Sequence, residues 1–193
     1  MVERLQEAIE KARRQREQRD HAAPALAPGP ERSQDVAWER LPELDFDPAA
    51  LRRERVVTHD RWHVAHLDFD KLRTRLSKVF SAAGWSRLAI TSATRGCGKS
   101  VVSTNLAFSL SRQRAGRVLL VDLDLRAPRL ASIFGAREHF DLGAFLQSDA
   151  PAEDHIRRVG PALAVTLHSP STPDSSELIQ DTRLPVRLAA PPD

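Results

Sequence analysis

The chain has 193 residues, which is enough for one domain of ordinary size and a tail. Hydrophobic residues make up 41% and charged residues 28%, which permits a packed core, and the 29 basic and 26 acidic residues are too evenly balanced to indicate nucleic acid binding. The single cysteine, Cys97, excludes an internal disulfide and favours a reducing, cytoplasmic compartment, and no apolar run approaches the roughly 20 residues that span a bilayer.

Three regions follow one another along the chain. Residues 1–20 alternate charges and carry a narrow apolar stripe at helical spacing, which predicts a short helix, either a solvated tail or a docking helix for a partner. Residues 21–66 begin rich in Ala, Pro and Asp and are expected to form a mostly disordered linker. Residues 67–193 are expected to form the folded domain.

The folded domain is predicted to open with a helix. Residues 67–82 carry Leu72, Leu76, Val79 and Phe80 at helical spacing. We expect this apolar stripe to pack on the part of the domain that follows.

An alternation of apolar and helical segments follows. Residues 87–92 form a short β-rich apolar run, residues 99–114 have helical periodicity, and residues 118–121 are all apolar, as in a strand buried on both faces. This is the order of a βαβ unit. Further helices are expected at residues 128–134, 141–147 and 176–181, with a third strand at residues 163–167. The fold class is therefore α/β, with a parallel sheet flanked by helices.

A phosphate-binding loop is the first functional motif. Residues 93–100 (ATRGCGKS) match Gly-x-x-x-x-Gly-Lys-Ser except at the first position, which is Ala93. The loop follows a predicted strand and opens a predicted helix, so its amides and the helix dipole can receive a triphosphate. Cys97 is expected to supply a backbone amide, with a redox-sensing thiol as the alternative. The predicted ATP contacts are Thr94, Arg95, Gly96, Cys97, Gly98, Lys99, Ser100 and Val101.

A pair of aspartates follows the second predicted strand. Asp122 and Asp124 are two residues apart, so in a continuing strand they point the same way, beside the phosphate loop. We expect Ser100 and Asp122 to bind Mg²⁺, and Lys99, Asp122 and Asp124 to serve catalysis. The alternative is that one carboxylate caps a neighbouring turn and the other is a surface residue.

These motifs together resemble a known family. The segment ITSATRGCGKSVVSTNLAFSLSRQRAGRVLLVDLDLRAPRLASIFG is similar to the bacterial tyrosine kinases (BY-kinases) of the CpsD/CapB family in capsule and exopolysaccharide synthesis. The resemblance implies a P-loop NTPase-like domain that binds ATP and Mg²⁺ and phosphorylates protein tyrosines. It also implies a membrane polysaccharide co-polymerase as activator, and a cytoplasmic location at the inner face of the membrane, held there through that partner.

The sequence departs from the family pattern in four places. No apolar run ending in Asp, the Walker B strand, follows Asp124, so the domain is expected to be incomplete at its C-terminus. The chain contains no tyrosine, so it cannot phosphorylate a tyrosine of its own. The family's ring-assembly motif falls at Leu67, Asp70 and Arg73, where only Arg73 matches, which weakens the case for a homo-oligomer. Arg95 stands where the family's loop commonly has Pro.

Two other functions compete with the kinase. A nucleotide-binding adaptor is compatible with the missing tyrosines and the missing Walker B strand. A P-loop ATPase of the partition and division-positioning type is the other candidate. That group carries a second lysine in its loop at the position where this chain has Thr94.

Overall fold

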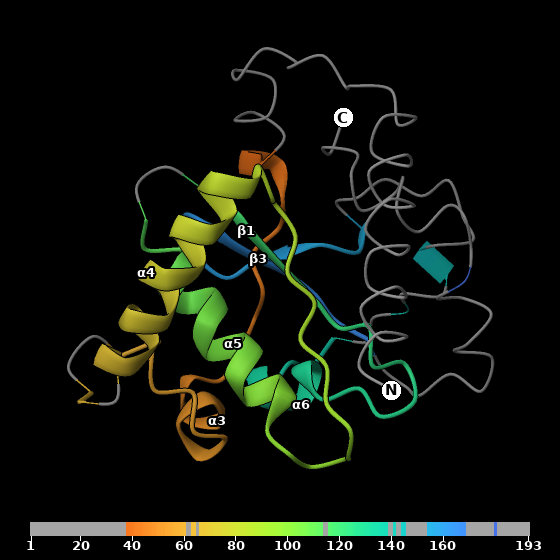
Figure 1. Ribbon diagram of the computed structural model, residues 1–193. Coiled ribbons are helices and arrows are strands. Elements are labelled where there is room, and N and C mark those ends of the chain that lie inside the picture. Colours follow the sequence, from red (N-terminus) through yellow and green to blue (C-terminus); the bar gives the residue numbers. More distant parts are fainter. Residues whose placement is uncertain are drawn as a thin grey trace.

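The computed structural model of the protein describes residues 38–60, 63–64, 66–113, 116–138, 141, 144–145, 154–168 and 180. Helices cover a small sheet (Figure 1). The elements in chain order are α3 (Pro48–Arg53), α4 (His66–Ala83), α5 (Lys99–Leu110), β1 (Val118–Val121), α6 (Leu130–Phe134), β2 (Arg157–Arg158) and β3 (Leu163–Thr166). The predicted helix at residues 1–20 lies outside the described residues, as do nearly all of the helices expected at 141–147 and 176–181.

The sheet is mixed, in the order β1-β3-β2. β1 and β3 are parallel, with Val118 opposite Leu163 and Val121 opposite Thr166. β2 is antiparallel to β3, so the α/β prediction is confirmed while the sheet is not wholly parallel. The carboxyl ends of β1 and β3 therefore meet at one edge of the sheet, and the segments that follow them lie side by side there.

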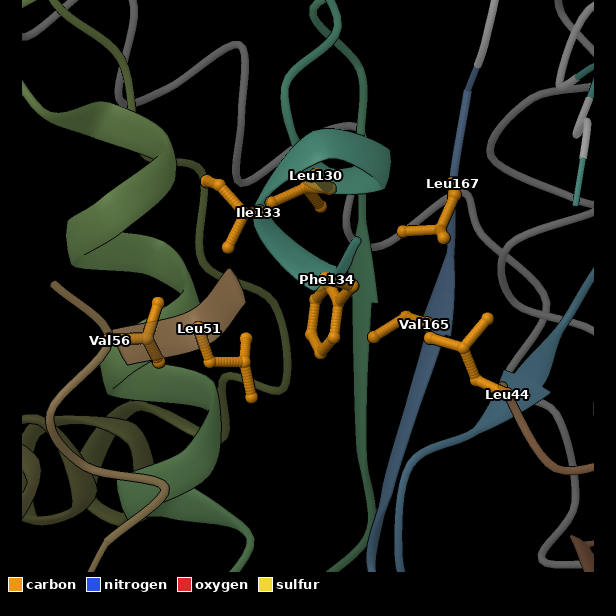
Figure 2. Close-up of a cluster of buried hydrophobic side chains, with 8 residues drawn as sticks. All are labelled: Leu44, Leu51, Val56, Leu130, Ile133, Phe134, Val165 and Leu167. Carbon is orange, nitrogen blue, oxygen red and sulfur yellow. The ribbon is translucent and has the colours of Figure 1, made fainter. Parts of the chain in front are cut away.

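The main core lies between the sheet and residues 38–60, which are called the N-terminal segment below. Figure 2 shows Phe134 of α6 between Leu51 on one side and Val165 of β3 on the other. All three are fully buried, and they belong to one cluster with Leu44, Val56, Leu130, Ile133 and Leu167. The core thus joins α3, α6 and β3, which are far apart in the sequence.

Residues 38–60 correct the prediction of a disordered linker across 21–66. They contain α3, which Asp47 caps by accepting a hydrogen bond from the amide of Ala49 at 2.8 Å, and they place Leu41 in a second small core. Glu43 also bridges to Arg158 of β2. Their many Glu, Asp and Arg residues concealed a few apolar side chains at the right spacing for burial.

One side chain fastens this segment to α5. Asn105 is 1% exposed, and its carbonyl oxygen accepts hydrogen bonds from the amides of Val57 and Thr58 at 2.8 and 3.0 Å. Its amide nitrogen donates to the carbonyls of Arg55 and Val101 at 3.1 and 2.8 Å. A buried amide with all four of its bonding positions filled holds the turn after α3 against α5, the helix that opens the candidate site.

The strand expected at residues 87–92 is absent. Residues 85–92 have no regular structure and are exposed except for Ile90, which is intermediate. A strand is stable only when a neighbour satisfies its backbone groups, and β1, at the edge of the described sheet, pairs only with β3. Leu119 of β1 is 37% exposed, contrary to the burial expected for both faces of that strand.

The helix predicted at 67–82 is confirmed as α4, but its predicted apolar stripe is covered only in part. No residue of α4 is fully buried: Leu76 and Phe80 are half-buried, and Leu72 and Val79 are 38% and 49% exposed. Its contact with α5 includes polar bonds: Asp70 accepts a hydrogen bond from Ser109 at 2.8 Å, and Arg73 donates to the Ser109 carbonyl at 3.0 Å. Asp70 and Arg73, two positions of the expected ring-assembly motif, therefore make contacts within the chain.

The other predicted elements are confirmed with small shifts. The helix expected at 99–114 ends at Leu110, with Ser111 as its C-cap. The helix expected at 128–134 is α6, and the strand expected at 163–167 is β3, which is buried along its whole length.

Two glycines test whether the N-terminal segment is packed on α6. Gly135 has φ +59°, and a Cβ there would lie 2.9 Å from that of Ala50, whereas Gly84 has φ +64° with nothing within 4 Å. Both Ala variants lose about 1 kcal/mol for the left-handed backbone. Gly135→Ala should lose about 1–3 kcal/mol more from the clash.

Urea denaturation of the two variants measures the difference in unfolding free energy. Equal losses for Gly135→Ala and Gly84→Ala would contradict the packing of residues 47–50 on α6.

Candidate nucleotide-binding site

The phosphate loop adopts the backbone that its glycines were expected to supply. Gly96 and Gly98 have φ values of +74° and +92°, which side-chain-bearing residues rarely adopt. Gly98 is the N-cap of α5, so the loop runs directly into the start of a 12-residue helix. Residues 93–97 are exposed, which leaves the loop open to a ligand at the positive end of the α5 dipole.

Lys99 faces one of the two predicted aspartates. Its Nζ lies 3.7 Å from Oδ2 of Asp124, with side-chain exposures of 26% and 39%. The other oxygen of Asp124 accepts a hydrogen bond from the amide of Ala127 at 3.2 Å. The structure thus brings an ammonium and a partly exposed carboxylate together at the mouth of the loop.

Asp122 has different surroundings. It is 5% exposed, and its Oδ1 accepts a hydrogen bond from the amide of Asp124 at 3.2 Å. Its Oδ2 accepts from the amides of Arg129 and Leu130, both at 3.0 Å, at the start of α6. Burial raises the pKa of Asp122, and these backbone N–H groups offset the rise in part. Asp122 therefore organises the loop between β1 and α6.

His168 is a buried polar residue at this end of the sheet that sequence reasoning missed. It is 1% exposed and follows β3, whose carboxyl end lies beside that of β1. Burial lowers the pKa of His168, while the charges of Asp141 and Asp122 act in the opposite direction. The signal available in the sequence was its position just after a strand expected to be parallel to the one before Asp122.

Cys97 lies on the exposed side of the loop. Its thiol donates a hydrogen bond to the carbonyl of Thr94 at 3.2 Å, which closes the turn. Hydrogen bonding to Ser92 lowers the pKa of the Cys97 thiol, burial opposes this, and the amide and ammonium of Lys99 lower it further.

The remaining predicted contact residues line the same turn and the first turn of α5. Thr94 and Arg95 are exposed, and Ser100 and Val101 are half-buried. Among the residues that the structure describes, no three His, Cys, Asp or Glu side chains are grouped to hold a metal by themselves. The Ser100 hydroxyl and the partly exposed Asp124 carboxylate are oxygen ligands of the kind that suits Mg²⁺. This ion commonly takes only one or two protein oxygens and completes its shell with phosphates and water.

A family comparison decides the nature of the site. Residues 88–182 match the CobQ/CobB/MinD/ParA nucleotide binding domain, and they include both the phosphate loop and the aspartates. The chain carries a P-loop nucleotide-binding domain. That domain implies a bound nucleotide and, with it, a divalent cation.

Two solved structures resemble the chain. The BceF tyrosine kinase domain is 26% identical with a TM-score of 0.60, over 77% of this chain and 63% of that one. The chimerical protein CapA2B2 is 26% identical with a TM-score of 0.58, over 79% of this chain and 67% of that one. The chain is therefore similar in fold to the BceF tyrosine kinase domain and to CapA2B2.

A curated relative lies in a different functional group. The flagellum site-determining protein YlxH of Helicobacter pylori (strain ATCC 700392 / 26695) is 35% identical over 78 residues. This match covers 40% of the chain and only 26% of the relative, so the chain spans about a quarter of that protein's length.

A matched pair of substitutions separates the two aspartates. Asp122→Ala should lower the free energy of unfolding by about 2–4 kcal/mol, because it leaves three amides without their acceptor. Asp124→Ala should cost less, about 0.5–1.5 kcal/mol, because it removes one acceptor of one backbone amide. It should instead weaken Mg²⁺-dependent ATP binding roughly tenfold or more, an effect typical of losing a group beside a metal.

Urea denaturation and calorimetric ATP titrations with and without Mg²⁺ measure both effects. If Asp122→Ala were instead stable and defective in Mg²⁺-dependent ATP binding, Asp122 and not Asp124 would be the Mg²⁺ ligand.

Proposed function

We propose that the chain binds ATP and Mg²⁺ and acts as a protein-tyrosine kinase of the BY-kinase type, in the control of exopolysaccharide or capsule synthesis and export. The observation that carries the proposal is the pairing of Lys99 with Asp124 across a glycine turn that opens α5. The likeness to the BceF tyrosine kinase domain supports the kinase over other P-loop functions.

The chemistry rests on positioning and charge. The loop amides and the Lys99 ammonium would bind the outer phosphates and stabilise the charge that develops on the transferred group. The Ser100 hydroxyl and the Asp124 carboxylate would hold Mg²⁺, which when bound neutralises phosphate charge. Asp122 would keep the β1–α6 loop, and hence Asp124, in place through its bonds to Arg129 and Leu130.

The substrate would be a tyrosine on another protein, because this chain contains no tyrosine. We place the protein in the cytoplasm at the inner face of the membrane, with a membrane polysaccharide co-polymerase as its activator. These assignments extend the resemblance to the BY-kinases.

A P-loop ATPase that positions cell structures is the second candidate. The match to YlxH, a flagellum site-determining protein, and the CobQ/CobB/MinD/ParA domain favour it. Thr94, where that group carries a second lysine, counts against it. A nucleotide-binding adaptor without transfer activity is the third outcome that an experiment must recognise.

Radiolabelled ATP with a tyrosine-containing acidic peptide tests the proposal. We expect label on the peptide, and a loss of at least about 100-fold in Lys99→Met, which removes an ammonium from the phosphates. Release of labelled phosphate without peptide labelling would favour the positioning ATPase. Nucleotide binding by calorimetry with neither product would favour the adaptor.

A further inference from the structure

The outer surface of α4 carries exposed apolar side chains, against which no other described helix or strand packs. Figure 1 shows α4 as an outer helix, with α5 between it and the strands. Leu72 and Val79 recur at helical spacing on this surface and are 38% and 49% exposed. Trp85 follows the helix and is 58% exposed. Exposed apolar side chains gathered at one place mark a contact surface.

Trp85 is fixed at the end of the helix. Gly84 adopts φ +64°, and the amide of Trp85 donates to the carbonyl of Phe80 at 3.0 Å, which is a glycine-terminated helix cap. The indole is therefore presented from a defined position next to α4. Tryptophan concentrates at membrane–water interfaces, where its ring meets the headgroup region.

A line of cations runs beside the apolar one. Lys71, Arg75 and Lys78 are exposed and recur at helical spacing, one position before Leu72, Leu76 and Val79. The only acidic residue on this outward surface of α4 is Asp68, which pairs with Lys71 at 3.1 Å while both side chains stay largely exposed. Asp70 instead accepts a hydrogen bond from Ser109 of α5 and pairs with His66 and Arg73 of its own helix.

We propose that α4 and Trp85 form a docking surface for an anionic lipid membrane. A helix with a basic line beside an apolar line is typical of segments that lie on such a membrane. A second copy of the chain fits this surface less well, because a two-fold contact would bring the three cations of one copy against those of the other. The proposal goes beyond the kinase function and does not depend on it, because the surface lies on α4, which packs on the side of α5 away from the sheet.

Vesicle co-sedimentation tests the proposal. The full chain should sediment with phosphatidylserine-containing vesicles and not with pure phosphatidylcholine vesicles, and high salt should release it. The triple variant Lys71→Gln, Arg75→Gln, Lys78→Gln should partition about 100-fold more weakly, the product of three lost contacts to an anionic surface. The control variant Arg40→Gln, Arg52→Gln, Arg137→Gln removes the same charge from exposed sites off α4 and should bind as the wild type does.

The fluorescence of Trp85 gives a second measurement, made on the wild-type protein. Anionic vesicles should shift the tryptophan fluorescence of the wild type to the blue, and Trp85→Phe should abolish the shift. The proposal would be overturned if the wild type stayed in the supernatant with anionic vesicles. It would also be overturned if the triple variant and its control lost vesicle binding equally. A stable dimer in light scattering that Leu72→Ser with Val79→Ser abolishes would overturn it as well, because this surface would then bind a second copy.

Discussion

The Asp122 carboxylate is the interaction on which the arrangement of the site depends. It joins the carboxyl end of β1 to the start of α6 through the amides of Arg129 and Leu130, and it also accepts a hydrogen bond from the amide of Asp124 in the loop between them. The loop between them then turns so that Asp124, two residues further on, meets Lys99. A buried carboxylate with a pKa raised by burial is tolerated because these hydrogen bonds compensate it, and they hold Asp122 in place beside Asp124.

The N-terminal segment supports the same arrangement from the other side. Leu51 and Val56 fill the core against Phe134, and Glu54 pairs with Arg129 at 3.3 Å, the residue whose amide binds Asp122. Asn105 ties the turn after α3 to the helix that opens at the phosphate loop. Both ends of the site, α5 and α6, are thus held by residues that precede the phosphate loop by about forty positions or more.

The sequence predicted the local features that depend on neighbouring residues. The glycine turn, α5, β1 and β3 each follow from periodicity or from a residue type, and Gly96 and Gly98 adopt the expected positive φ. It did not predict features that depend on distant partners. Residues 87–92 have strand composition without a paired neighbour, and Leu51 and Val56 lie in a polar stretch that becomes core only when α6 packs on it.

The two aspartates show the same limit within the site. Their spacing predicted that both side chains point the same way from a continuing strand, but β1 ends at Val121, so Asp122 turns inward to α6 while Asp124 turns to Lys99. Strand alternation cannot be extended past the last paired residue, and the difference between capping and ligand binding is decided by which backbone amides lie nearby.

A crystal structure with Mg²⁺ and a non-hydrolysable ATP analogue would test the different roles proposed for the two aspartates. We expect Lys99 to contact the outer phosphates, Asp124 to lie in the Mg²⁺ shell, and Asp122 to keep its hydrogen bonds to the amides of Arg129 and Leu130. A complex in which Asp122 leaves those amides to bind the metal, while Asp124 points into solvent, would contradict these roles.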